Sequence, residues 1–284
     1  VILGWSEQVF ATVSELVIAN ENQRHAAIAI LGDRDQVEME DEIRHRIKSL
    51  GPTRIVCRRG NPTQHDDLNL VSPQTSKSII ILTADDDEHP DATTIKTILA
   101  LTNARDRRPD PYQIVGVLQD NSNEEIARLV GGNEVAIVMS GDTIAKIMAQ
   151  TCRQAGLSKV YMDLCDFEGD EIYFHEEPQL VGKSFSDAMH AYEDSTVIGI
   201  ATATGAVLLK PPIDTVIAAG DQIIALSEDD DTVRLSGIAT PPLQQDAIVA
   251  RQHAQRAPEH TLILGWNWRA ATIIEQLDAY VAPG

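Results

Sequence analysis

This chain of 284 residues has few aromatic residues, few cysteines and a shortage of positive charge. Aromatic residues make up 4% of it, so its core must be built from aliphatic side chains. The three cysteines, Cys57, Cys152 and Cys165, are widely spaced, which argues against a disulfide framework or a zinc site and suits a reducing compartment. Lys and Arg number 23 against 43 Asp and Glu, a formal net charge of −20. We therefore expect no nucleic acid partner and no adhesion to an anionic membrane, because both need clustered positive charge.

Long hydrophobic runs are also missing. No stretch approaches the roughly 20 apolar residues of a membrane-spanning helix, and there is no signal peptide. The chain opens without a Met on the apolar run Val1-Ile2-Leu3. We therefore expect a piece of a longer protein, so the missing membrane segment describes the piece and not its parent.

Short β-branched runs alternate with segments of helical periodicity over residues 1–156. The runs are nearly continuously apolar, as in Ile79-Ile80-Ile81-Leu82, which is expected of parallel strands covered by helices on both faces. The pattern predicts an α/β fold with a Rossmann-like, doubly wound parallel sheet. The expected strands are 1–3, 26–31, 54–58, 78–83, 113–118 and 134–139.

A further helix is expected over 142–155. Its residues Ile144, Ile147, Met148 and Thr151 form one stripe at three- and four-residue spacing. The stripe either packs against the helix's own sheet or belongs to a crossover helix that pairs two copies of the chain.

The pattern changes over 157–236, where two hairpin signals predict a small α+β domain of antiparallel strands. The first signal, Glu168-Gly169-Asp170, lies between expected strands 160–167 and 171–175. The second, Thr204-Gly205-Ala206, lies between 197–203 and 207–210. A short helix is expected around 186–192, beginning at Ser184 or Ser186, and a last strand over 222–227. Residues 237–260, with Thr240-Pro241-Pro242 and a Gln-rich stretch, are expected to form a linker.

One short motif occurs twice. Ile2-Leu3-Gly4-Trp5 returns as Ile263-Leu264-Gly265-Trp266, and each copy is followed by a helical pattern. We expect residues 261–284 to be the first strand and helix of a second, truncated copy of the opening unit.

The turn after the first expected strand is a degenerate form of the glycine-rich nucleotide loop. In Gly4-Trp5-Ser6-Glu7-Gln8-Val9 only the first glycine is kept, Trp5 stands where the backbone would approach a phosphate, and Glu7 adds repulsive charge. Asp33 follows the second strand, where an acid holds a ribose hydroxyl or simply closes a turn. A degenerate nucleotide site would consist of Gly4, Trp5, Asp33, Arg34, Gly60 and Thr83.

An acidic loop follows the fourth expected strand. Because ligands bind at the carboxyl ends of strands in open α/β sheets, and because Ca²⁺ prefers oxygen ligands, the loop is a candidate metal site. A solvated loop that caps the next helix explains the same residues. The candidate ligands are Asp85, Asp86, Asp87, Glu88 and Asp91.

No catalytic set emerges from the sequence. The eight histidines are scattered, and neither H-E-x-x-H nor G-x-S-x-G occurs. We expect the chain not to be an enzyme, although a nucleotide-dependent oxidoreductase stays as the least favoured alternative.

Several of these segments resemble the RCK domains, which regulate K⁺ conductance and also form the regulatory subunits of Trk- and Ktr-type potassium uptake systems. Gly60-Asn61-Pro62-Thr63, then Leu68, then 78–84 and the acidic loop are similar to the turn and the fourth strand of that family. Val181-Gly182-Lys183-Ser184 and Ala219-Gly220-Asp221-Gln222 are similar to its C-terminal subdomain. The resemblance covers about 1–235 and restarts at 261–284.

The Gly-Trp turn and the tandem copies look like the CASTOR/POLLUX group of ion channels. This resemblance implies an upstream transmembrane pore, a tetrameric gating ring on the cytoplasmic side and gating by a cytosolic ligand, with Ca²⁺ the leading candidate and a nucleotide less certain. It also implies that the isolated piece is a homo-oligomer, most simply a dimer. A soluble subunit of a potassium uptake system is the alternative function.

Overall fold

The computed structural model describes residues 1–237 and 260–279. Contacts divide the chain into two compact units, Val1–Leu157 with Trp266–Gly284 (unit 1) and Ser158–Gly265 (unit 2). The expected linker over 237–260 lies outside the described residues except at its two ends. Within the described residues, no helix combines the length and the apolar character needed to cross a membrane.

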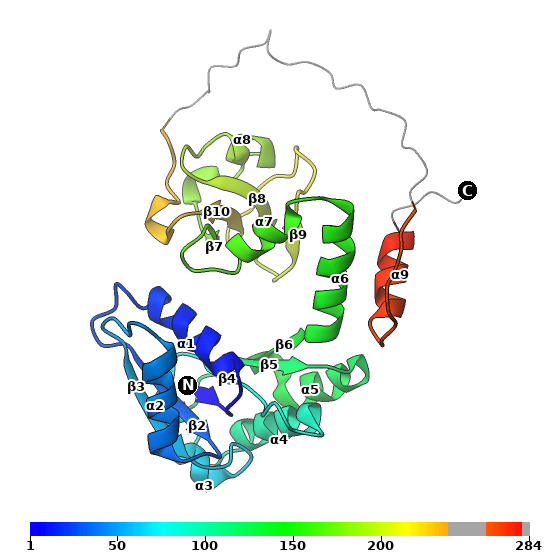
Figure 1. The fold of residues 1–284 in the computed structure, drawn as a ribbon. Coiled ribbons are helices and arrows are strands. Elements are labelled where there is room, and N and C mark those ends of the chain that lie inside the picture. The colour runs from blue at the N-terminus through cyan, green and yellow to red at the C-terminus, as the bar shows by residue number, and fades with distance from the viewer. Residues whose placement is uncertain (238–259, 280–284) are drawn as a thin grey trace. The chain divides into compact units, whose positions relative to one another are not determined.

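Unit 1 is built on a parallel sheet of six strands (Figure 1). The order β3-β2-β1-β4-β5-β6 reverses direction beside β1, which confirms the predicted doubly wound, Rossmann-like fold. The strands start and end within three residues of the expected limits. Their bounds are β1 Ile2–Leu3, β2 Ala27–Gly32, β3 Arg54–Arg59, β4 Ile79–Ile81, β5 Ile114–Leu118 and β6 Val135–Met139.

Two hydrophobic clusters sandwich this sheet, because successive side chains of a strand point to opposite faces. Ile2 joins Val9 and Met39 beneath α1 (Gln8–Ala19) and α2 (Gln36–Arg46). Leu3 joins the cluster on the other face, with Leu68 of α3 (His65–Leu68) and residues of α4 (Pro90–Thr102). Helix α5 (Glu124–Gly131) packs beside α4. Each fully buried aliphatic side chain contributes about 1.5–3 kcal/mol.

Helix α6 (Ser140–Arg153) begins two residues before its expected start. Ile144 and Met148 are 42% and 53% exposed, so the interpretation that their stripe packs against the sheet is wrong. The buried positions are small residues at four-residue spacing, Gly141, Ala145 and Ala149, which share one face of the helix.

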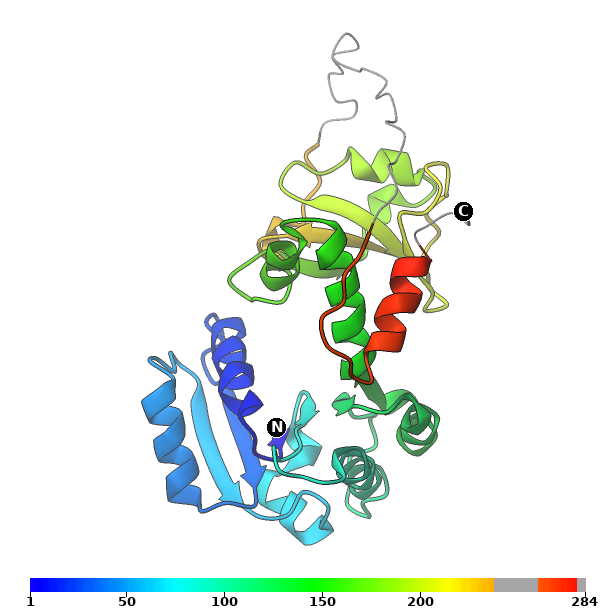
Figure 2. The same cartoon turned by 45° about the vertical axis from the view of Figure 1, so that its right-hand side comes forward.

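The second copy of the repeated motif contributes a helix but no strand. Helix α9 (Ala270–Asp278) packs alongside α6 (Figures 1 and 2). Residues 261–264 are not a strand here: Leu262 and Leu264 are 80% and 86% exposed, whereas Ile2 and Leu3 of the first copy are fully buried. A central strand of a parallel sheet forms only between neighbouring strands, and none of the described strands pairs with this segment.

Unit 2 holds an antiparallel sheet of order β7-β10-β8-β9. Its strands are β7 (Glu171–His175), β8 (Thr196–Ala201), β9 (Val207–Leu209) and β10 (Gln222–Ser227). Helix α8 (Phe185–Met189) begins at the predicted Ser184, whose hydroxyl accepts a hydrogen bond from the Asp187 amide. The expected strand over 160–167 is wrong. Its first half belongs to helix α7 (Leu157–Asp163), because Leu157, Val160 and Leu164 recur at helical and not alternating spacing.

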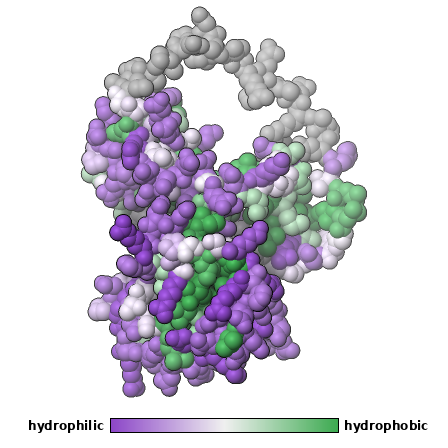
Figure 3. Space-filling view, turned by 60° about the vertical axis from the view of Figure 1, so that its left-hand side comes forward, coloured by the Kyte–Doolittle hydropathy of each residue, from purple (hydrophilic) through white to green (hydrophobic). Residues whose placement is uncertain are grey.

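Short 3-10 turns complete the described elements, at Asn69–Val71, Pro73–Thr75, Asn121–Asn123, Gly132–Glu134, Pro178–Leu180 and Asp230–Thr232. The surface seen in Figure 3 is mostly hydrophilic, as the composition requires, and hydrophobic side chains gather there in a band across unit 1.

Candidate functional site

A cavity of about 730 Å³ opens at the carboxyl edge of the unit 1 sheet. It lies where β1, β2 and β4 end, beside the reversal in strand order, which is where ligands bind in open α/β sheets. Of the predicted nucleotide set, all residues except Gly60 line it, and Asn61 and Pro62 take the place of that glycine. Asp85, Asp86 and Asp87 of the predicted metal set also line this cavity.

The turn after β1 needs a glycine at position 4. Gly4 has a φ of +105°, and a β-carbon there would lie 1.8 Å from the Leu82 carbonyl oxygen. Leu82 in turn donates its amide to the Leu3 carbonyl at 2.7 Å. The close approach of β1 and the end of β4 therefore requires Gly4, whatever the cavity binds.

Trp5 does not reach into the cavity as an open platform. Its side chain is 9% exposed and belongs to the core cluster beneath α1. Its ring meets the ring of Phe10 edge to face with 5.7 Å between centroids, and the Arg34 guanidinium lies 5.8 Å from the Trp5 ring centroid. Trp5 thus anchors the turn, while Arg34 adds a positive charge at the rim.

The β3 side of the cavity is shaped by a local side-chain turn. The Asn61 carboxamide oxygen accepts hydrogen bonds from both the amide and the hydroxyl of Thr63, each at 2.9 Å. The Asn61 amide donates to Asp67 of α3 at 2.8 Å. These bonds explain why Asn and Thr follow Gly60, and they place Asn61 and Pro62 at the wall.

The acidic loop after β4 is tied down by its own side chains. Asp85 accepts a hydrogen bond from the Glu7 amide at 2.9 Å. Asp87 accepts from the Thr93 hydroxyl at 2.6 Å and from the His89 amide at 2.8 Å. The bond from Thr93, followed by that from His89, lowers the pKa of Asp87. Asp87 is therefore a fixed negative charge at neutral pH.

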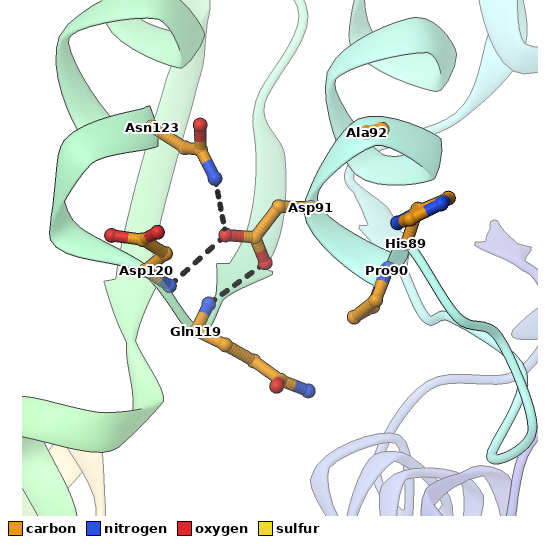
Figure 4. Close-up of a pocket in the computed structure, with 7 residues that line it drawn as sticks. All are labelled: His89, Pro90, Asp91, Ala92, Gln119, Asp120 and Asn123. Atoms are coloured by element: carbon orange, nitrogen blue, oxygen red, sulfur yellow. Dashed lines mark hydrogen bonds between the residues drawn. The ribbon is translucent and has the colours of Figure 1, made fainter. Parts of the chain in front are cut away.

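Asp91 lies apart from the rest of the predicted metal set. It lines a second cavity of about 280 Å³, and its side chain is 8% exposed (Figure 4). Its two oxygens accept hydrogen bonds from the amides of Gln119 and Asp120 at 2.8 and 3.0 Å and from the Asn123 carboxamide at 2.8 Å. Asp91 therefore joins α4 to the turn after β5, and three of its roughly four acceptor sites are already used.

The five predicted metal ligands do not form one site. Asp91 is committed to the second cavity, and Glu88 is not among the residues that line the first. Within the described parts of the chain, no group of three or more His, Cys, Asp or Glu side chains is placed to hold a metal ion. The residues present therefore do not fit a ready-made Ca²⁺ cage, and we derive no step through that ion.

The charges of the first cavity are unbalanced. Its charged lining residues are Asp33, Asp85, Asp86 and Asp87 against Arg34 alone. Arg34 also pairs with Glu42 at 3.0 Å. The field inside this cavity is therefore negative, which favours a cation and opposes a phosphate.

Sequence reasoning missed the wall residues that carry no charge, such as Thr93 and Thr97 of α4, and the whole second cavity. A signal for the second cavity was present. Asp120 and Asn123 follow an apolar strand as Asp-Asn-Ser-Asn, a helix-start pattern at the same edge of the sheet.

Comparison with known proteins identifies the class of this domain. Residues 1–115 match the RCK domain of calcium-activated, slowpoke-like potassium channels, and residues 141–242 match a domain described as "Castor and Pollux, part of voltage-gated ion channel". The human SLO3 gating ring has the same fold, with a TM-score of 0.58 and 16% identity over 82% of this chain and 45% of that one. The chain is thus an RCK-type regulatory domain.

The chain is similar over its whole length to the CASTOR and POLLUX ion channels. It is 33% identical over its whole length to the probable ion channel CASTOR of Oryza sativa subsp. japonica, of which it covers 32%. It is 32% identical to the probable ion channel POLLUX of Arabidopsis thaliana, of which it covers 34%. The chain therefore spans about a third of these relatives, which are ion channels and not enzymes.

Proposed function

We propose that this chain is the ligand-sensing regulatory module of a cation channel. In this proposal the module lies on the cytoplasmic side of a membrane, and a pore precedes it in the parent protein. Binding of a cytosolic ligand in the 730 Å³ cavity changes the arrangement of a ring of such modules and so the opening of the pore. The channel relatives and the gating-ring fold support the regulatory role.

One observation carries the assignment of the cavity. Residues far apart in sequence, Trp5, Arg34, Thr83 and Asp87, meet in one hollow at the reversal of the strand order. The loops that form this hollow join β1, β2 and β4 to the helices on both faces of the sheet. A ligand held there would restrain both layers of unit 1 at once.

Coupling to a pore would follow from a population shift. The ligand can move the ring between two states only by the difference in its affinity for them. A change from mostly closed to mostly open needs about 5.5 kcal/mol summed over the bound ligands. A tetrameric ring shares this requirement among its subunits, so a modest preference at each cavity is enough.

Assembly of the ring would need an apolar surface on each module. Ile144 and Met148 form an exposed stripe of large apolar side chains on α6, whereas the buried face of the helix carries small residues. We propose that this stripe contributes to contact between copies of the chain, which would make the isolated piece a dimer. The nature of the relatives favours a channel over the soluble uptake subunit.

Isothermal titration of the ligand candidates into the chelator-treated chain tests the sensing role. Ca²⁺ is titrated first, with Mg²⁺ at the same ionic strength as the matched control, and a nucleotide follows. Saturable heat that Asp33→Asn and Asp87→Asn abolish would support sensing in this cavity. Equal heats for both ions, unaffected by these variants, would show that the acidic residues only bind counterions.

A further inference from the structure

The backbone amide at the N-cap of α1 is held by a carboxylate from another part of the chain. The Glu7 amide donates to Asp85 Oδ2 at 2.9 Å, across 78 residues of sequence. Glu7 stands at the N-cap of α1 and makes no capping bond with its own side chain, which instead pairs with Arg46. The Asp85 carboxylate therefore supplies the hydrogen-bond acceptor that this helix start lacks.

This amide lies at the start of the first helix, which is where a phosphate binds in a nucleotide-binding sheet. There, the turn after the first strand directs free amides and the positive end of the first helix at the pyrophosphate. Unit 1 keeps the geometry of that turn, because Gly4 has a positive φ and lies directly against the Leu82 carbonyl. The anion that this amide binds here is the Asp85 carboxylate, from the loop that follows β4, and not a phosphate.

The surroundings strengthen the exclusion of a second anion. Asp86 and Asp87 line the same cavity, and Asp87 is held ionised by its hydrogen bonds to Thr93 and His89. A phosphate that approached the Glu7 amide would have to displace Asp85 and remain beside these charges. Arg34 is the sole cation among the charged lining residues, and it already pairs with Glu42.

We propose that Asp85 is a specificity-determining residue, an internal anion that occupies the phosphate position of the Rossmann turn and so closes the cavity to phosphate-bearing ligands. The negative charge of the lining residues then favours a cationic ligand. This inference refines the proposed sensing role of the cavity and rests on it, but the exclusion itself is a property of the chain alone.

The test measures ADP binding to the whole chain by isothermal titration, for the unaltered protein and for Asp85→Ala. The unaltered protein should bind ADP weakly or not at all. Removing the carboxylate frees the Glu7 amide, so ADP affinity should rise at least about tenfold. The matched control, Asp86→Ala, removes the same charge from the same cavity and leaves the Asp85–Glu7 bond in place, so its gain should stay below about threefold.

Two results would overturn the proposal. One is equal ADP affinity in the unaltered protein and Asp85→Ala, and the other is an equal gain in Asp85→Ala and Asp86→Ala, which would show a general effect of charge. If circular dichroism shows that Asp85→Ala does not fold, Asp85→Gly, which also lacks a side-chain acceptor, takes its place, with hydrogen exchange of the Glu7 amide as a second measurement. Exchange should then accelerate at Glu7 and not at Val13, and unchanged exchange at Glu7 contradicts the proposal.

These outcomes are independent of whether the cavity controls a pore. If ADP is excluded by Asp85 but no cation affects the channel, the proposed function fails and the inference stands. If ADP binding does not depend on Asp85 but cation binding depends on Asp33, the reverse holds.

Discussion

The ring of Trp268 lies so close over Gly141 that a β-carbon at position 141 would be 2.0 Å from Trp268 Cη2. Gly141 is in the first turn of α6, and Trp268 precedes α9, the helix that belongs to the second copy of the repeated motif. The absence of a side chain at position 141 thus lets the start of the second repeat pack against α6 of the first.

This contact predicts a strong coupling between the two positions. Gly141→Ala alone should destabilise unit 1 by about 1–3 kcal/mol, because the new methyl group overlaps the ring. In a Trp268→Ala background the same change should be neutral or stabilise by up to about 1 kcal/mol, since Ala is the better helix former. Urea unfolding of the single and double variants measures the coupling, and additive effects would show that the two residues do not touch.

The turn after β1 predicts an unequal cost for two glycine substitutions. Gly4→Ala and Gly205→Ala both place a β-carbon at a positive φ, which costs about 1–2 kcal/mol. At Gly205 nothing lies within 4 Å of the added carbon, whereas at Gly4 it overlaps the Leu82 carbonyl. Gly4→Ala should therefore lower the midpoint of thermal unfolding much further than Gly205→Ala. Equal shifts would mean that β1 and the end of β4 are farther apart than described.

Glu134 predicts a pH dependence of stability. Burial would raise the pKa of its carboxyl group, but the hydrogen bond from the Tyr112 amide and the two hydrogen bonds from Arg107 Nη2 outweigh burial and lower this pKa. Because the pKa is lower in the folded state, the carboxylate stabilises the fold above the unfolded pKa, near 4.5. This stability is lost as the pH falls through the folded pKa.

Glu134→Gln should therefore destabilise the chain at pH 7 and converge with the unaltered protein in acid, below the folded pKa. The measurement is the free energy of unfolding in urea between pH 7 and pH 3. Glu124→Gln is the control, because its bond to Arg128 is an exposed pair within one helix and contributes little. A pH-independent difference for Glu134→Gln would contradict the account.

The three cysteines should differ in reactivity. Burial, followed by the nearby charge of Glu40, raises the pKa of the Cys57 thiol to about 12, and its side chain is fully buried. Cys152 and Cys165 are exposed. A thiol reagent at pH 8 should label Cys152 and Cys165 in the native protein and label Cys57 only after unfolding, because the thiolate is the reactive form. Early labelling of Cys57 would show that the core beneath α2 opens.

The fold of unit 1 could be predicted from sequence because its strands are short apolar runs, and these runs alternate with segments of helical periodicity. The failures have physical causes. Val160 and Leu164 fit both a helix and a strand over so short a segment, and the structure has helix α7 there. Ile263 and Leu264 repeat a strand sequence, but a strand needs partners that this chain does not provide in its described residues.

The site was predicted only in part, for a related reason. The carboxyl ends of parallel strands meet at one edge, so Trp5, Asp33 and Thr83 could be placed together from sequence. Which carboxylates stay free could not be predicted, because it depends on local donors. The amides of Gln119 and Asp120 take Asp91 out of the predicted metal set, and the Glu7 amide takes Asp85.

The central claim is that occupation of the 730 Å³ cavity controls the opening of a pore. The most direct test attaches a bulky group inside the cavity, which requires no knowledge of the natural ligand. Ala84 lines the cavity and is exposed. In the parent channel that we propose, Ala84→Cys can be modified by a bulky cationic thiol reagent, applied from the proposed cytoplasmic side, while single-channel open probability is recorded. The unaltered channel controls for Cys152 and Cys165, and Asp110→Cys controls for an exposed site outside the cavity. Modification should change the open probability of Ala84→Cys alone. An open probability that stays the same as in both controls would contradict the account.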